Sequence, residues 1–443
     1  MIETISNCFD SHVHLLATGQ VANELKLNQL QKISDLKKLV ITSAHYRGDW
    51  LVGFGWDENK WDENSQQIDR YILDEYFPDQ PVYFSRVDGH SGWLNSKAIL
   101  ELERLKYNFT SDIFGGEIIR NIKNGEPTGI LKDQAHINAM LLLPKYSDDQ
   151  IINFLVTAGS LFNQGGFTHV RDMSMSYHQW RIQSELLKQQ KLHLYCEGFI
   201  TIESIDDFDR GYQEYMNCLN SPSNYLKIKG MKIFVDGSLG SETAYISQKY
   251  IGSNSNGQLC WPSQDIKKVI ELCWKKKIEI AIHTIGDEAV HIVALIAREI
   301  SASGLIGKIH LEHCQVLRPD TIQLLKPLHV AVHMQPCHWL SDHSWLEKKI
   351  GRLKQHLFPW ELVRKNRVQI YFGSDSPIEP PVLLRNKLAL ELSQKHGIPR
   401  LSDDWKKYHS YPTTPIGASW GDCITTIQND QIESVYFDSK KII

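Results

Sequence analysis

Six side chains in this sequence have the types and positions needed to bind a divalent metal ion. His12 and His14 stand two residues apart in FDSHVH, and a strand directs such residues to one face. The other four lie within or at the end of short apolar runs: Lys232, His283, His313 and Asp375. Imidazole and carboxylate groups are good ligands for Zn²⁺, Fe²⁺, Mn²⁺ and Co²⁺. The set predicts a centre of one or two divalent ions, with zinc as the first choice.

Lys232 is the unexpected member of this set, because an ammonium group repels a metal ion. A neutral lysine can react with CO2 to form a carbamate, an anionic ligand that can bridge two metals. Burial lowers the pKa of a lysine and favours the neutral form. We therefore expect a carboxylated Lys232, with Asp375 as a ligand that also moves a proton during catalysis.

Each of these features is weak by itself. The chain has 19 histidines, and a single histidine on an apolar strand is usually a structural residue. The HxH pair and the lysine are also common outside metal sites. The prediction depends on their occurring together, one after another, at the ends of successive strands.

The elements that must position these groups are strands alternating with helices. Eight short runs rich in Val, Ile, Phe and Tyr favour strands, namely Cys8–His14, Phe167–Asp172, Leu192–Phe199, Gly230–Asp236, Ile278–His283, Ile309–Cys314, Val330–Gln335 and Gln369–Asp375. Amphipathic stretches lie between them, one after Asp287, which we expect to be a helix N-cap. This alternation predicts an α/β protein with a (β/α)8 TIM barrel, whose strand ends meet at one mouth.

The predicted barrel has one large insertion and a reduced small β-domain. About 150 residues separate the first two runs, far more than a crossover helix needs. We expect the barrel over 8–16 and 151–400, and an inserted subdomain over the barrel mouth at 17–150. The segments 1–7 and 412–443 are expected to form the remnant of a small β-sandwich, with a hairpin around Asn429 and Asp430.

The sequence resembles the amidohydrolase superfamily along nearly its whole length, within the branch that contains N-substituted formamide deformylases. The resemblance is carried by FDSHVHLLATG, GFGWDENKW, SRVDGHSGWLNSKAI, PTGILKDQA, KIFVDGSLGSETA, HTIGDEAV, LEHCQVL, MQPCHW and FGSDSPIEPP. It departs from the branch at its short ends, since only seven residues precede Cys8. Either the small sandwich is reduced, or the sequence begins late.

The resemblance implies that the metal ligands of the family fall on the same six residues, all of which are present. It implies hydrolysis of a C–N bond, amide-type and non-peptide, in a small organic substrate, with a metal-bound hydroxide as nucleophile. An aminohydrolase or lactonase on the same barrel is an alternative, and so is phosphoester hydrolysis. A truncated relative without activity is a third reading, which the filled ligand positions disfavour.

Several further residues are candidates for substrate binding. In the insertion these are Trp56, His90 and Trp93, although buried aromatic residues are more often core. After the seventh strand, Gln335 and His338 are expected at the mouth. The loop VDGSLGSETA lacks the P-loop spacing, so a tight loop beside Lys232 is expected. Its Asp236 either orients a ligand or caps the turn.

Composition excludes several other classes of protein. The net charge of -4 and the absence of a long apolar run give no sign of a nucleic-acid or membrane surface. The eight scattered cysteines contain no CxxC, which is typical of reduced thiols. We expect a cytoplasmic enzyme that binds a small molecule and a divalent metal, and its ordinary charge is compatible with a homodimer.

Overall fold

The structure is a computed structural model that describes residues 2–42, 45–61, 68–111, 113–411 and 423–443. The chain divides into two compact units. The first consists of Met1–Gly19 and Ile151–Ile443, and the second is Gln20–Gln150. Among the described residues, no helix is both long and apolar enough to cross a bilayer.

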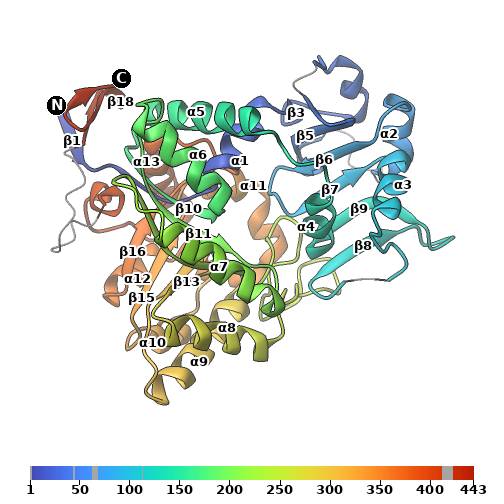
Figure 1. Cartoon of the computed structure of the whole chain (residues 1–443). Helices are drawn as coiled ribbons and strands as arrows, with labels where there is room; N and C mark the ends of the chain where they lie inside the picture. Colours follow the sequence, from blue (N-terminus) through green and yellow to red (C-terminus); the bar gives the residue numbers. More distant parts are fainter. Residues whose placement is uncertain (1, 43–44, 62–67, 112, 412–422) are drawn as a thin grey trace. The chain divides into compact units, whose positions relative to one another are not determined.

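The first unit contains eight parallel strands, counted over its described residues, that follow one another in chain order around one sheet (Figure 1). They are β2 (Phe9–Val13), β10 (His169–Met175), β11 (Tyr195–Thr201), β12 (Leu226–Phe234), β13 (Glu279–Thr284), β14 (Ile309–His313), β15 (Val330–Met334) and β16 (Gln369–Phe372). A parallel bridge between Val13 and Ser376 joins the first strand to the segment after the last. The predicted (β/α)8 barrel is therefore confirmed.

Helices connect the strands of the barrel. They are α1 (Leu15–Asn23), α5 (Asp148–Gln164), α6 (Tyr177–Lys188), α7 (Phe208–Leu219), α8 (Ser263–Lys275), α9 (Asp287–Ala302), α10 (Pro319–Leu325), α11 (His338–Ile350), α12 (Trp360–Lys365) and α13 (Leu383–Ser393). The N-cap of α9 is Gly286 and not Asp287. Asp287 is the first residue of that helix, where its carboxylate accepts the Ser247 N–H and binds Arg318.

The main hydrophobic core lies between strands and helices. The face of α8 that carries Ile266, Val269 and Ile270 is fully buried against this core, as are Ile280 and Ile282 of β13. Apolar residues at i, i+3 and i+4 give a helix one such face. Burial of this face fixes each helix against its strands, so the strand ends are held in constant positions.

The second unit is built on a mixed sheet of seven strands over its described residues. The strands are β3 (Leu25–Lys26), β4 (Tyr46–Arg47), β5 (Trp50–Trp56), β6 (Val82–Arg86), β7 (Ser91–Leu94), β8 (Gly116–Arg120) and β9 (Pro127–Asp133), with helices α2 (Arg70–Tyr76), α3 (Ser96–Arg104) and α4 (Gln134–Leu141). Its core contains Trp56, Trp61 and Trp93. The large insertion after the first barrel strand is thus a folded unit with its own core.

A small antiparallel sheet lies at the two ends of the chain, which Figure 1 shows beside each other. It contains β1 (Ile2–Ser6), β17 (Ile424–Gln428), β18 (Gln431–Phe437) and β19 (Lys440–Lys441), with β1 paired to β17. Asn429 and Asp430 connect β17 to β18, and both have left-handed backbone angles, φ 51° and 56°. Such angles are typical of a two-residue hairpin turn, so the predicted hairpin is confirmed. Residues 412–422 of the predicted remnant lie outside the described residues.

Candidate metal centre

Asp375 lies between two pairs of histidines at the ends of the barrel strands. Its Oδ1 is 3.2 Å from His12 Nε2 and 3.5 Å from His14 Nε2. Its Oδ2 is 3.6 Å from His338 Nε2 and 3.9 Å from His313 Nδ1. Each pair offers ligand atoms that lie, together with a carboxylate oxygen of Asp375, within 4.8 Å of one another. Segments distant in the sequence thus supply groups close enough to share a metal ion.

The backbone at the seam between the first and last strands holds these groups close together. Asp375 N donates to His12 O, and His14 N donates to Ser376 O, both at 2.8 Å. Gly373 allows this approach, since a Cβ there would lie 2.7 Å from His12 N. Asp375 and His313 have left-handed backbone angles, φ 59° and 72°. Non-glycine residues adopt this conformation at a cost and concentrate at functional sites.

Neighbouring groups fix the orientation of three of the imidazole rings. His12 Nδ1 is 2.6 Å from Glu312 Oε2, and His14 Nδ1 is 3.1 Å from Ser174 Oγ. His313 Nδ1 is 2.9 Å from Gln335 Oε1. With Nδ1–H donated in each case, Nε2 of each ring keeps its lone pair for a metal. For His313 this means that the nitrogen 3.9 Å from Asp375 is bonded to Gln335 and that the other nitrogen would be the ligand atom.

His283 and Lys232 lie at the same end of the barrel. His283 Nε2 is 3.1 Å from Gly237 O and 3.8 Å from Asp236 Oδ1. Its ring centroid is 4.5 Å from that of His313. Lys232 is fully buried, with Nζ 4.6 Å from the centre of the Phe234 ring. The structure therefore brings His283 beside His313 and leaves Lys232 among apolar and charged neighbours.

Burial and charge set the protonation of these groups. Burial alone would raise the pKa of Asp375, but the charge of the neighbouring His12 holds this pKa well below its usual value. Burial lowers the pKa of both His14 and His313, so these rings are neutral and able to bind metal. Burial also lowers the pKa of Lys232 to about 8, although Glu312 and Asp375 oppose it. The neutral lysine that a carbamate requires is thus accessible near neutral pH.

A divalent cation fits the polar atoms that the protein leaves unsatisfied here. His12 Nε2, Lys232 Nζ and His338 Nε2 are buried and have no hydrogen-bond partner among the described residues. A buried polar atom without a partner is costly in free energy. A bound cation and a carbamate on Lys232 would satisfy His12 Nε2 and Lys232 Nζ, and His338 Nε2 would be left for a substrate.

Asp236 anchors backbone in the loop after β12. Its Oδ1 accepts the N–H of Ile285 at 2.9 Å, and its Oδ2 accepts those of Gly286 at 2.8 Å and Tyr245 at 3.0 Å. These bonds favour the capping role over ligand orientation. The loop is thereby fastened to the start of α9, beside His283.

The predicted substrate-binding residues fall into two groups. Gln335 and His338 lie at the centre, where Gln335 holds His313 and His338 faces Asp375. In the second unit, Trp56 and Trp93 are buried, and their indole N–H groups donate to Phe84 O and Asp69 O. Such satisfied rings are typical of a core. The two units are not placed relative to each other, so the binding role of the residues in the second unit stays a prediction.

His90 is held by a carboxylate within the second unit. Its Nδ1 is 2.9 Å from Oδ1 of the buried Asp133, whose backbone φ is 47°. Arg86 of the same unit binds three acidic side chains, those of Asp57, Glu58 and Asp88. The pairing of Arg86 with Asp88 is thus one part of a larger ion-pair cluster.

Sequence reasoning missed three residues that contact the proposed ligands or their supports. Glu312 holds His12, Arg171 binds Glu312, and Ser174 contacts His14. A signal for Glu312 was present in LEHC, where a carboxylate stands inside an apolar strand next to a proposed ligand. Nothing comparable marked Ser174, because its contact depends on strand register.

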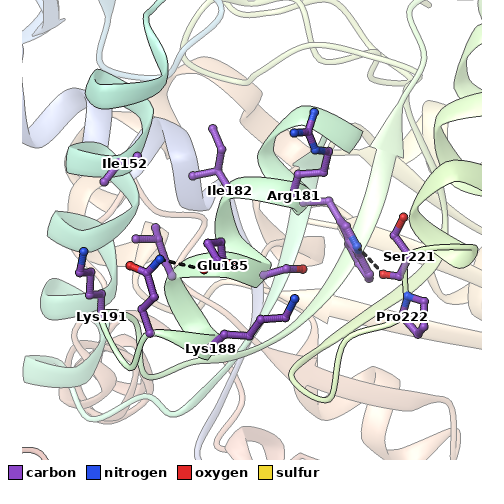
Figure 2. A pocket seen from close by; sticks show the side chains of 12 residues that line it. Ile152, Arg181, Ile182, Glu185, Lys188, Lys191, Ser221 and Pro222 are labelled. Atoms are coloured by element: carbon purple, nitrogen blue, oxygen red, sulfur yellow. Dashed lines mark hydrogen bonds between the residues drawn. The ribbon is translucent and has the colours of Figure 1, made fainter.

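A surface pocket lies elsewhere on the first unit, along α6 (Figure 2). It is lined by residues of α5 and α6 and by the segment after α7, with Trp180 Nε1 donating to Ser221 O. None of the proposed ligands lines it. The metal centre and this pocket are therefore separate features.

The sequence matches the amidohydrolase family over residues 9–385. The chain belongs to the amidohydrolase family. This membership makes it a metal-dependent hydrolase, in agreement with the donor set at the strand ends.

Individual amidohydrolase relatives are similar at a moderate level. A putative amidohydrolase, YtcJ, from Bacillus subtilis is 29% identical over 84% of this chain and 70% of its own length. The N-substituted formamide deformylase of Arthrobacter pascens is 23% identical over 83% and 69%. The crystal structure of an uncharacterized metal-dependent hydrolase from Pyrococcus horikoshii OT3 matches with a TM-score of 0.66 at 24% identity. The match covers 89% of this chain and 76% of the Pyrococcus chain. That likeness supports the fold.

Proposed function

We propose that this amidohydrolase cleaves the C–N bond of a small, non-peptide organic amide, of the formamide or N-acyl amine type. The observation that carries the proposal is the position of Asp375, an ionised carboxylate between two histidine pairs. The name of one relative, N-substituted formamide deformylase, motivates the formamide class. Family membership supports hydrolysis at such a bond.

The proposed ligands are the six residues named from the sequence, with one or two ions and zinc as the first choice. A metal of this kind supplies a Lewis acid that polarises a carbonyl oxygen and makes water nucleophilic at neutral pH. The protein contributes fixed geometry, since Glu312, Ser174 and Gln335 hold three of the rings. Two ions require Lys232 as a carbamate, and its lowered pKa supports that state.

Asp375 is proposed to move the proton. Its pKa is held well below the usual value, so the carboxylate is ionised and accepts a proton from the attacking water. The same group then donates this proton to the leaving amine, whose departure completes the reaction. Gln335 and His338 flank this position and are proposed to contact the substrate. The aspartate therefore serves both halves of the reaction.

The test combines metal analysis with turnover. Purified protein is analysed for bound metal and assayed on formamides and N-acyl amines, with a lactone and an aminopurine representing the alternative classes. We expect one or two ions per chain and amide hydrolysis. In Asp375→Asn, kcat should fall by about 10²–10⁴-fold, the range for removal of a general acid–base group.

The control is Asp287→Asn, which changes a buried aspartate that accepts the Ser247 N–H and binds Arg318. This control variant should have a lower thermal stability than wild type, but its kcat should fall less than that of Asp375→Asn. Protein that binds no metal and remains inactive after addition of Zn²⁺, Mn²⁺ or Co²⁺ would contradict the proposal. Turnover of the lactone or aminopurine with none of the amide would replace the amide class with that alternative.

A further inference from the structure

We propose that Glu312, itself held by Arg171, is the positioning residue that makes His12 a metal ligand through Nε2. The inference rests on the metal-binding part of the proposed function. It adds to the centre a buried carboxylate–guanidinium pair that contacts a proposed ligand from the side opposite Asp375.

The contacts form a continuous chain in the barrel interior. Glu312 Oε2 is 2.6 Å from His12 Nδ1, and Glu312 Oε1 accepts from Arg171 Nη1 at 2.9 Å. The same Arg171 nitrogen donates to Ser11 O at 3.1 Å. His12 and Glu312 are fully buried, and Arg171 is 1% exposed. Arg171 therefore joins the carboxylate to the backbone of the strand that carries the HxH pair.

This arrangement selects one of the two neutral forms of His12. A carboxylate accepts a hydrogen bond from Nδ1–H and cannot donate one in return. Nε2 is then the unprotonated nitrogen, and it is the atom that lies 3.2 Å from Asp375 Oδ1. The hydrogen bond also stops rotation of the ring, which loosely held ligands undergo. Glu312 thus determines both which atom faces the ion and in which direction.

Arg171 fixes the orientation of Glu312. Its guanidinium binds Oε1 at 2.9 Å and leaves Oε2 for the His12 ring. The guanidinium also lies over the Phe199 ring, with Cζ 4.3 Å from the ring centre. A buried ion pair is costly to form and strongly destabilising when one partner is lost. A merely structural role would not require that such a pair contact a ligand.

A second histidine–carboxylate pair in the same barrel provides the matched control. Glu279 Oε2 is 2.7 Å from His310 Nε2, the same contact type at nearly the same distance. Glu279 is also bound by Lys229, as Glu312 is by Arg171. Over the residues that the structure describes, the other side-chain hydrogen bonds and ion pairs of this second pair are with His333, Lys229 and Lys308, and none is with a proposed ligand. Glu279→Gln therefore repeats the chemical change of Glu312→Gln away from the centre.

The experiment measures metal affinity without relying on activity. Wild type, Glu312→Gln and Glu279→Gln are stripped of metal and titrated with Co²⁺ against a competing chelator, and the Co²⁺ visible spectrum is recorded. Loss of a carboxylate that supports a ligand weakens metal binding by about 10–100-fold. We expect this loss, with an altered spectrum, for Glu312→Gln, and binding within about twofold of wild type for Glu279→Gln.

A third variant separates positioning from folding. In Arg171→Met/Glu312→Gln the buried charge left by the single change is removed, so the thermal stability of the stripped protein should recover toward wild type. Co²⁺ affinity should remain lowered, because the carboxylate is still absent. This variant decides the question if the single variant does not fold.

Two results would overturn the inference. One is Co²⁺ binding by Glu312→Gln or by the double variant within about twofold of wild type. The other is an equal loss of affinity in Glu279→Gln, which would indicate a general effect of barrel stability. If wild type itself binds no Co²⁺, the proposed function fails first, and that outcome is distinguishable from both.

Discussion

Two histidine–carboxylate clusters occupy the same barrel and differ in how they satisfy their polar atoms. At the strand ends, His12 Nε2 and Lys232 Nζ are buried without a hydrogen-bond partner among the described residues. Within the strands, both nitrogens of His310 are bonded, to His333 at 2.9 Å and to Glu279 at 2.7 Å. The second cluster thus supplies both hydrogen-bond partners of His310 from its own residues. The first cluster leaves His12 Nε2 and Lys232 Nζ without such partners near Asp375.

The difference shows that residue type alone does not identify a site. Both clusters contain buried histidines and a carboxylate bound by a cation. Only the cluster at the strand ends combines unsatisfied atoms with left-handed backbone at His313 and Asp375. The inner cluster thus bonds both nitrogens of His310, whereas the outer cluster bonds one nitrogen of His12 and leaves Nε2 without a partner among the described residues.

The largest effect that would sharpen this contrast is loss of metal on removal of one histidine. His12→Gln should weaken metal binding by more than about 100-fold, since it deletes a ligand and not merely a support. His310→Gln should keep the metal and instead lose about 1–3 kcal/mol of stability, as expected for a broken buried hydrogen bond. Metal content and urea unfolding of both variants test this; equal metal loss in both would abolish the distinction.

The next effect concerns two lysines of β12. Lys232, whose pKa is lowered to about 8, is roughly one tenth neutral at pH 7. Lys229, despite its burial, has a raised pKa because of Glu197 and Glu279. ¹³C-bicarbonate should therefore give a carbamate NMR signal in wild type and Lys229→Met but not in Lys232→Met. A signal that persists in Lys232→Met would place the carbamate elsewhere.

A smaller effect is the acid sensitivity of the inner cluster. Burial lowers the pKa of His310 to about 3, whereas the unfolded chain binds this proton near pH 6.5. Unfolded protein thus binds more protons between these values, and stability is lost as pH falls from 6.5 toward 3. From pH 7 to 5, wild type should lose about 2 kcal/mol more than His310→Gln. Urea unfolding at both pH values measures this. An equal loss of unfolding free energy in the two proteins would refute the prediction.

The smallest expected effect is at the exposed margin of the same cluster. Lys308 Nζ is 3.7 Å from Glu279 Oε2, and both side chains are about one quarter exposed. Lys308→Met should change stability by less than about 1 kcal/mol and leave Co²⁺ affinity unaltered. A larger loss in thermal denaturation would mean that the cluster depends on its solvent-facing charge.

The barrel was predictable because its signals are local. Each of the eight predicted runs overlaps a barrel strand, in the predicted order. The runs are short and apolar and are flanked by amphipathic helices. The order of the strands in the sheet then follows the order of the runs in the chain. The cap of α9 was misassigned by one residue, since Gly286 and Asp287 are both reasonable at a helix start.

The proposed ligands were predictable in part, and their supports were not. His12 and His14 stand out by spacing, and strand ends converge in a barrel. Glu312 and Arg171 belong to strands distant in sequence, and their pairing depends on how side chains meet inside the closed sheet. The position of His313 at the end of its run favoured it over His310, but the sequence does not show that His310 is satisfied by Glu279 while His313 faces Asp375.

The seam between β2 and β16 has a consequence for biosynthesis. Of the barrel strands, the HxH strand leaves the ribosome first, but its neighbour across the seam and Asp375 follow more than 350 residues later. Pairing of such distant segments is slow, and the amino-terminal strand must wait with one edge exposed. A nascent chain that stalls before residue 375 would therefore contain His12 and His14 without the Asp375 carboxylate that lies beside them. Its exposed strand edge would be a binding site for chaperones before the metal centre can form.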